Sequence, residues 1–253
     1  MSKKSEWWDV SWNPVEGCKR GCTYCWAKKF FRRFHKTAKF EDVRFHPERL
    51  NRPLLWKRPK RIFVGSMCDL FADWTPRAWV DRILEVVRKC PQHTFMFLTK
   101  SPAGYRHFKY PKNVWLGASV SSHKDWFTAV ELIRLKRNNL KFLSVEPVLG
   151  WIDTGYFFLA NWIIVGGLTP KPVHKKEWID KFLEYNYSLK KPIFLKDNLH
   201  YQKVIKEFPK LNTSSNHSRK DSETVGLTSL SQHTWLAKSH CGGCKTLTGG
   251  FAS

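Results

Sequence analysis

The feature that most constrains the fold of this chain is a series of short apolar runs separated by segments with helical periodicity. The runs are rich in β-branched and aromatic residues and have turn signals on both sides, which favours strands over buried helices. We expect strands at Arg61–Gly65, Thr94–Thr99, Val114–Ser119, Lys141–Val145, Trp162–Gly166 and Pro192–Lys196, with a further candidate first strand near Asp9–Trp12.

Between these runs lie segments in which apolar residues recur at the helical period, at Pro76–Lys89, Asp125–Asn138 and Lys175–Leu189. Repeated strand–helix units form a parallel sheet with the helices outside it. We therefore predict an α/β fold with a full or partial (β/α) barrel of the TIM type. An open doubly wound sheet is the alternative. A chain of 253 residues, of which 42% are hydrophobic, can supply a core of that size.

Polar side chains follow five of the expected strands. Because the carboxyl ends of parallel strands meet at one edge, such residues converge on a common pocket. The alternative is that strand ends are polar only because they meet solvent, but five in succession favour a shared site. The residues are Ser66 and Asp69, then Lys100, then Ser119 and Ser121, then Ser144 and Glu146, and finally Lys196, Asp197 and Asn198.

Three cysteines, Cys18, Cys22 and Cys25, share one short loop with C-x3-C-x2-C spacing after the expected first strand. A structural zinc site closes with four protein ligands. Three nearby thiolates can instead hold three irons of a [4Fe-4S] cluster and leave the fourth iron open to a small molecule. Radical chemistry with S-adenosylmethionine needs such an open iron. The alternatives are zinc completed by a distant residue such as His35 or His46, or three bystander thiols.

The chain carries a formal net charge of +23, and such a field attracts polyanions. Basic residues cluster after the cysteine loop and interleave with aromatic ones, a composition that grips a phosphate backbone and stacks on bases. The alternative is a charge spread over a solvated surface. The basic residues are Lys28, Lys29, Arg32, Arg33, Lys36 and Lys39, and the aromatic ones are Trp26, Phe30, Phe31 and Phe34.

Seven cysteines, an odd number, argue against a disulfide framework and for a reducing compartment. The polar N-terminus contains no secretory segment, and no apolar run is long enough to span a bilayer. We therefore expect a cytoplasmic protein that does not associate with membranes.

The composition changes near residue 211, after which polar residues and glycine dominate. Such a segment buries too little apolar surface to fold alone. We predict a barrel domain over residues 1–210 and a disordered tail over 211–253. Cys241 and Cys244 form a C-x2-C pair in this tail, which could bind zinc, join an auxiliary cluster or act as a redox dithiol, or have no role at all.

Several motifs in the body resemble, in order, those of the phage-encoded three-cysteine-motif family, an uncharacterised group related to radical S-adenosylmethionine barrels. This resemblance runs from about Trp7 to about Pro209. The cysteine loop itself, with Tyr24 just before its last cysteine, resembles the signature of the radical S-adenosylmethionine superfamily. The resemblance implies the barrel fold, a [4Fe-4S] cluster on the three cysteines and S-adenosylmethionine as cosubstrate, but no particular reaction. The motifs are WNP at 12–14, VGSMCDLF at 64–71, LTKSP at 98–102, WLG at 115–117, LSVEPVLG at 143–150 and IVGG at 164–167.

With that cofactor pair, the polar strand ends receive candidate roles. Ser66 and Asp69 would hold the cosubstrate's amino group, and Ser119, Ser144 and Glu146 its ribose or carboxylate. Gly166 and Gly167 would let its adenine approach the backbone, and Lys100 and Lys196 would face the substrate. One position departs from the resemblance, because Ser121 stands where an acidic residue is expected to bind the ribose; Glu146 is the candidate replacement.

We therefore expect a radical S-adenosylmethionine enzyme that receives electrons from a donor, generates a 5′-deoxyadenosyl radical and modifies a nucleic acid or nucleotide. The alternative is a non-catalytic nucleic-acid-binding protein with a structural zinc site.

Overall fold

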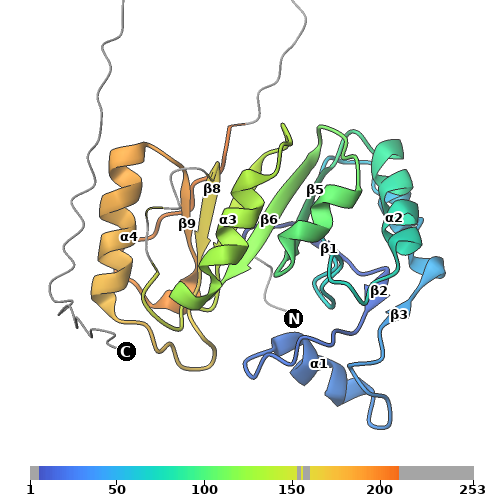
Figure 1. The fold of residues 1–253 in the computed structure, drawn as a ribbon, viewed down its shortest axis with the longest axis horizontal. Helices are drawn as coiled ribbons and strands as arrows, with labels where there is room; N and C mark the ends of the chain where they lie inside the picture. The colour runs from blue at the N-terminus through green and yellow to red at the C-terminus, as the bar shows by residue number, and fades with distance from the viewer. Residues whose placement is uncertain (1–5, 153–154, 156–159, 211–253) are drawn as a thin grey trace, which may run out of the picture. The chain divides into compact units, whose positions relative to one another are not determined.

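The computed structural model describes residues 6–152, 155 and 160–210, which belong to one compact unit, Met1–Leu211. The predicted disordered tail, with Cys241 and Cys244, lies outside the described residues. At the centre is a seven-stranded parallel sheet (Figure 1). Its strands lie side by side in the same order as they follow one another in the sequence. Its strands are β1 (Val10–Trp12), β4 (Arg61–Val64), β5 (Thr94–Thr99), β6 (Val114–Val120), β7 (Lys141–Val145), β8 (Trp162–Val165) and β9 (Ile193–Leu195).

The order of the strands settles the architecture. It runs β1-β4-β5-β6-β7-β8-β9, and the sheet curls into a half-barrel. A doubly wound sheet would reverse direction at a switch point, and this sheet has no reversal. The fold is therefore a mixed α/β half-barrel, compatible with the partial (β/α) barrel expected from the sequence.

The helices and a small hairpin surround this sheet. Helices α2, α3 and α4 lie along the sheet in Figure 1, whereas α1 lies beyond the carboxyl ends of the strands. The bounds are α1 (Trp26–Phe34), α2 (Arg77–Lys89), α3 (Trp126–Arg134) and α4 (Lys176–Leu189), with short 3-10 turns at Pro47–Arg49, Arg52–Leu55, Pro102–His107, His123–Asp125 and Asp197–Leu199. The hairpin pairs β2 (Val15–Glu16) with β3 (Arg44–Phe45) in antiparallel fashion.

Helix α3 ends at Arg134, four residues before the predicted Asn138. Leu135 turns to an extended conformation and is buried, with 4% of its surface exposed. The ammonium group of Lys141 donates to the carbonyl oxygens of Ile133, at 3.1 Å, and Leu135, at 2.6 Å. These bonds satisfy carbonyls that a continued helix would have used, so the helix stops there.

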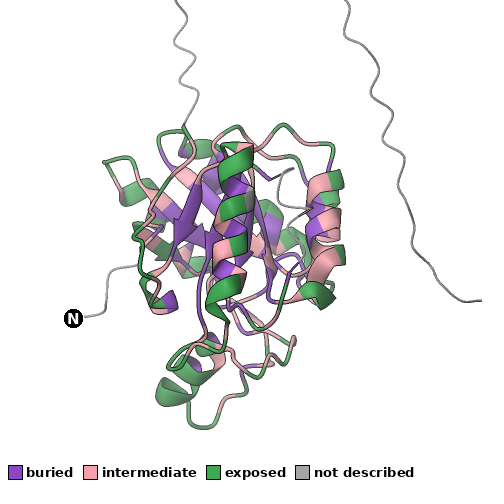
Figure 2. Cartoon of the chain, turned by 90° about the vertical axis from the view of Figure 1, so that its left-hand side faces the viewer, coloured by how far each residue is buried: buried purple, intermediate pink, exposed green. Residues whose placement is uncertain are grey.

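Side chains alternate between the two faces of the sheet, as strand geometry requires. On β6, Leu116 and Ala118 join the large apolar cluster formed with the helices, whereas Trp115 belongs to a separate aromatic cluster on the opposite, concave face. Figure 2 shows the strands buried inside the covering helices. The concave cluster consists of Trp7, Phe63, Met96, Trp115, Phe142, Trp162, Ile164 and Phe194.

The segment just before β1 reaches across to the other end of the sheet. Trp7 is 1% exposed, and its ring lies 5.2 Å from that of Phe63 and 6.0 Å from that of Trp162. The carboxylate of Glu6 accepts hydrogen bonds from the backbone N–H of Asp197, at 2.9 Å, and from the ammonium group of Lys206. These contacts connect the β1 and β9 sides of the half-barrel. None of the helices described is long and apolar enough to cross a membrane.

Candidate cysteine-lined active site

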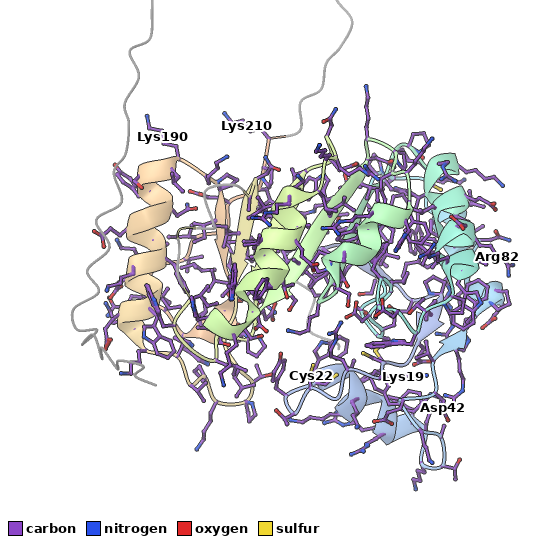
Figure 3. All side chains as sticks on the ribbon, in the orientation of Figure 1. Lys19, Cys22, Asp42, Arg82, Lys190 and Lys210 are labelled. Atoms are coloured by element: carbon purple, nitrogen blue, oxygen red, sulfur yellow. The ribbon has the colours of Figure 1, made fainter. Side chains whose placement is uncertain are left out.

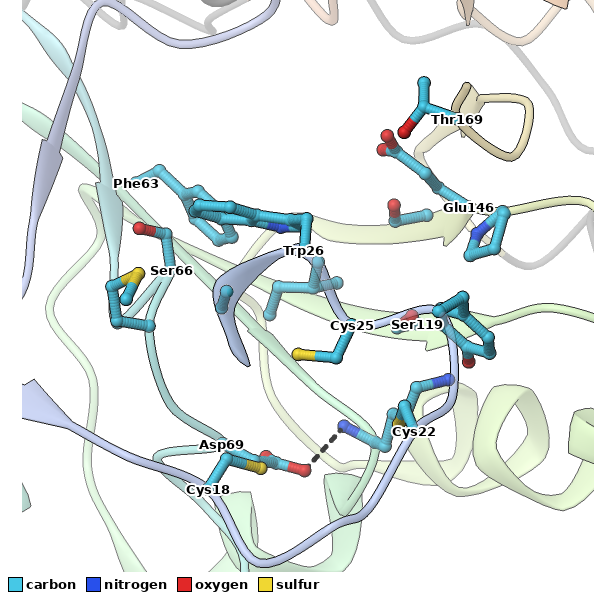
Figure 4. A pocket seen from close by; sticks show the side chains of 18 of the residues that line it. Cys18, Cys22, Cys25, Trp26, Phe63, Ser66, Asp69, Ser119, Glu146 and Thr169 are labelled. Carbon is cyan, nitrogen blue, oxygen red and sulfur yellow. Dashed lines mark hydrogen bonds between the residues drawn. The ribbon is translucent and has the colours of Figure 1, made fainter. Parts of the chain in front are cut away.

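A cavity of about 560 Å³ lies at the carboxyl ends of the strands, on the concave side of the sheet. Its walls come from the cysteine loop, from the start of α1 and from the residues that follow the strands (Figure 4). Most of the residues singled out in the sequence meet there, namely Cys18, Cys22, Cys25, Ser66, Asp69, Lys100, Ser119, Ser144, Glu146, Gly167 and Lys196.

The cysteine loop is held in place by its own backbone. It follows β1 and β2, and Cys25 caps the N-terminus of α1. Gly17 has a φ of +106°, and a Cβ there would lie 2.8 Å from two carbonyl oxygens. Its N–H donates to the carbonyl of Met67 at 3.0 Å, and the N–H of Cys18 donates to that of Phe40 at 2.9 Å. The positive φ at Gly17 and the close backbone contact around it are conditions that only glycine permits. Figure 3 shows Cys22 on this loop, between the sheet and α1.

Two of the three sulfurs already accept backbone hydrogen bonds. The N–H of Arg20 donates to Cys18 Sγ at 3.5 Å, and the N–H of Lys28 donates to Cys25 Sγ at 3.3 Å. Burial raises the pKa of the Cys18 thiol to about 11, and the nearby Asp69 carboxylate and the other two cysteines contribute in the same direction. A bound cation would have to displace the Cys18 proton, as is usual when thiols become metal ligands.

The donor set is of the kind that iron–sulfur clusters use, because three thiols share one short loop and line one cavity. Among the residues that the structure describes, no three His, Cys, Asp or Glu side chains are grouped closely enough to hold one metal ion.

Asp69 ties the cysteine loop to the sheet. Its buried carboxylate accepts hydrogen bonds from the Thr99 hydroxyl and from the N–H of Lys100, at 3.4 Å. The guanidinium of Arg20, between the first two cysteines, forms an ion pair with it at 2.9 Å and also donates to Ser101 Oγ at 2.5 Å. The sequence reasoning missed Arg20, for which the only signal was its place inside the loop. An amino group bound at Asp69 would share the carboxylate with this arginine.

The opposite wall of the cavity carries a second ion pair, between Glu146 and Lys196. Gly166 makes room for it, because a Cβ there would lie 2.9 Å from Glu146 Cδ and 3.0 Å from Lys196 Cδ. Gly167 and Asn198 exchange two hydrogen bonds, of 3.0 and 2.7 Å, between backbone and side-chain amide. A Cβ at Gly167 would lie 2.5 Å from the carbonyl oxygen of Asn198. Close packing therefore explains both glycines, besides the predicted contact with adenine.

Two polar groups in the cavity have free bonding capacity. Ser144 is 1% exposed, and its hydroxyl group has no hydrogen-bond partner among the described residues. The ammonium group of Lys100 lies 5.8 Å from the centre of the Tyr24 ring, and no carboxylate in the described part of the chain pairs with it. Ser66, in contrast, already donates to Asn13 Oδ1 at 3.1 Å.

Ser121 does not line the cavity. Its hydroxyl lies 3.2 Å from the Tyr24 hydroxyl, and its N–H donates to Asp125 at 2.6 Å. Asp125 also accepts a hydrogen bond from the N–H of Ser122, with which it forms a capping box at the next turn. Glu146 is the nearby acid that does face the cavity.

Cys68 lines the cavity beside the loop. Its thiol donates to the carbonyl of Gly65 at 3.6 Å, and burial raises its pKa well above the usual value. The two histidines considered as a fourth zinc ligand are not among the residues lining the cavity. His35 stacks on Phe31 at the far end of α1, and His46 lies between two glutamates, Glu16 and Glu48.

The fold and site together define an α/β half-barrel protein with a cysteine-lined cavity at the carboxyl ends of its strands. The chain belongs to the family described as "Protein of unknown function (DUF5131)", whose family model matches residues 2–234. No curated protein and no solved structure matches the chain significantly.

Proposed function

We propose that this protein is a radical S-adenosylmethionine enzyme whose [4Fe-4S] cluster is held by Cys18, Cys22 and Cys25. The observation that carries the proposal is that all three thiols line one cavity together with hydroxyl, carboxylate and ammonium groups. A site that binds only structural zinc has no need of such a cavity, since it closes with protein ligands on all four sides.

The loop supports a cluster in two further ways. Its backbone N–H groups already point at Cys18 and Cys25, and hydrogen bonds to the sulfurs are among the levers that set the properties of iron–sulfur clusters. The Arg20–Asp69 ion pair fixes the loop against the ends of β4 and β5. Protein groups alone thus hold the loop in place, and such contacts lower the entropy lost when a cluster binds.

Held by Cys18, Cys22 and Cys25 and reduced by a one-electron donor, a cluster would supply the electron for cleaving S-adenosylmethionine to methionine and a 5′-deoxyadenosyl radical, which would take a hydrogen atom from the substrate. The walls of the cavity would limit the access of water to that step. Trp7 and Phe63 of the concave aromatic cluster line the cavity, as do the cysteine loop and the start of α1.

The remaining polar groups have roles in binding the cosubstrate and the substrate. Glu146 accepts hydroxyl hydrogen bonds from a ribose, in place of an acid at position 121. Ser119 lines the cavity too, as does Ser144, whose hydroxyl has no hydrogen-bond partner among the described residues. Asp69 and Ser66 lie on the side of the loop and suit an amino group. Lys100 is the cation that remains available for an anionic group.

Anaerobic reconstitution with iron and sulfide tests the proposal. We expect a brown protein with broad visible absorption and about four irons per chain. Cys18→Ala, Cys22→Ala and Cys25→Ala should each abolish iron loading. Cys90→Ala should not, because Cys90 lies in the core formed with the helices and does not line the cavity. A colourless protein that carries one zinc would refute the proposal and favour the structural alternative.

A further inference from the structure

Helix α1 has two opposite faces of different character. Ala27 and Phe31 face inward and pack with Phe40 and Met67. The outward face carries Trp26, Phe30 and Phe34, which are 55%, 46% and 68% exposed. Residues four apart lie on the same side of a helix. Their ring centres are 6.3 and 4.9 Å apart, so the three rings form a continuous ladder along the helix.

The same face is positively charged. Lys29 and Arg33 are exposed, and each follows a ladder ring by three residues, which places it on the same side. No acidic residue occurs in α1. Within the described part of the chain, the one ion pair made by this helix is that of Lys28 with Glu41. The α1 ladder, defined as Trp26, Phe30 and Phe34 with Lys29 and Arg33, therefore combines exposed rings with unpaired cations.

The ladder begins at the mouth of the cavity. Trp26 is both its first ring and a residue that lines the cavity, and it directly follows the cluster ligand Cys25 (Figure 4). Farther along, the helix extends away from the sheet (Figure 1). A flexible ligand that lies along the ladder can thus reach the cavity with one end, where Lys100 is free to bind an anionic group.

We propose that the α1 ladder binds single-stranded nucleic acid and delivers one nucleotide to the cavity. Bases stack on the rings, and Lys29 and Arg33 bind the phosphates between them. A single strand is favoured over a duplex, because bases inside a duplex already stack on one another and offer no free face. The delivery step rests on the proposed function, whereas the binding step stands on the surface alone.

The binding step is tested with fluorescence anisotropy of a labelled single-stranded oligonucleotide of about 12 nucleotides. Phe30→Ala and Phe34→Ala should each weaken binding at least about fivefold, and Phe34→Tyr should preserve it, because stacking needs an aromatic face. The matched control is Tyr187→Ala on α4, where the ring is 88% exposed but isolated from the ladder, and we expect no change. Unchanged melting temperatures would show that the variants fold.

The phosphate contacts are tested through the salt dependence of binding. Lys29→Ala with Arg33→Ala should reduce the slope of log affinity against log salt by about 0.7 for each phosphate that is no longer neutralised. Lys175→Ala with Lys181→Ala, exposed residues at α4, should leave the slope unchanged. Equal changes of the salt slope in the two double variants would overturn the proposal. It would also be overturned if Phe30→Ala and Phe34→Ala bound the oligonucleotide as tightly as the wild type does.

Binding to anionic phospholipid vesicles tests the other use of such a surface. If the ring variants stop binding the vesicles while their oligonucleotide binding is unchanged, the ladder is a membrane contact instead, which would also overturn the proposal.

The experiments distinguish failure of the nucleic-acid-binding proposal from failure of the proposed enzyme function. A protein that loads iron and forms 5′-deoxyadenosine, but binds nucleic acid independently of the ladder, refutes only this inference. A protein that loads no cluster, but binds nucleic acid through the ladder, refutes the proposed function and the delivery step and supports the binding step.

Discussion

Replacing Gly117 by alanine should destabilise the protein through one well-defined collision. Gly117 lies in the middle of β6 and pairs with Phe142 of β7. A Cβ at this position would lie 2.3 Å from Cζ of the Phe142 ring and 2.6 Å from both Cε atoms. The ring is fully buried and is flanked by Trp7 at 5.9 Å and Trp162 at 5.8 Å. Neither the ring nor the strand can move without disturbing Trp7, which lines the cavity.

The magnitude follows from two opposing effects. Overpacking of a buried site typically destabilises by about 1–3 kcal/mol. Alanine restricts the unfolded chain more than glycine does, and this effect stabilises the folded protein by about 0.4–1 kcal/mol. Because the contact is far below van der Waals distance, we expect the upper part of the range and a net loss of about 2 kcal/mol in the free energy of unfolding. For a domain of this size that corresponds to a melting temperature lower by about 4–8 °C.

Thermal and urea unfolding followed by circular dichroism would measure the loss. Gly150→Ala is the matched control, because among the described residues its Cβ would meet only the Cβ of Ser122, at 3.4 Å. The stability of this variant should stay within about 0.5 kcal/mol of the wild type. A smaller residue at Phe142 should relieve the collision, so that Gly117→Ala combined with Phe142→Leu is less destabilised than the sum of the two single variants. An unchanged melting temperature for Gly117→Ala, or strict additivity in the double variant, would refute the packing described.

Three further predictions concern the loop and one surface pair. Gly17→Ala should prevent most iron loading in an iron assay after reconstitution, because its Cβ would collide with two carbonyl oxygens at 2.8 Å; full loading would contradict the loop geometry. Arg20→Gln should lower the free energy of unfolding by about 1–3 kcal/mol in urea, because it leaves the buried carboxylate of Asp69 without its cation; a change below about 0.5 kcal/mol would show that the ion pair is not formed. Asp180→Asn should lower the pKa of Tyr201, which burial together with the hydrogen bond and charge of Asp180 raises to about 12. The tyrosinate absorbance should then develop at a lower pH than in the wild type, and an identical titration would contradict the contact.

Much of the fold was predictable because the strands carry a strong local signal. The run at Thr94–Thr99 was predicted with the bounds that the structure shows, as was that at Lys141–Val145. Polar residues placed after such runs had to converge, since parallel strands end at one edge. For that reason Glu146 and Lys196 were predictable as neighbours in a pocket, although they are 50 residues apart.

The rest depends on contacts that leave no local pattern. The polar segment around Glu6 shows no periodicity, and its contact with Lys206 spans 200 residues. Arg20 has its partner Asp69 at a separation of 49 residues, and nothing near either residue indicates the other. The early end of α3 likewise depends on the Lys141 side chain, which belongs to the next strand.

The central claim is most directly tested by a search for 5′-deoxyadenosine. The reconstituted protein is incubated anaerobically with S-adenosylmethionine and dithionite, and the products are separated by chromatography and identified by mass. The account predicts that 5′-deoxyadenosine forms with the wild-type protein and not with Cys22→Ala. A protein that carries the full cluster and still forms no 5′-deoxyadenosine, with or without a single-stranded oligonucleotide, would contradict it.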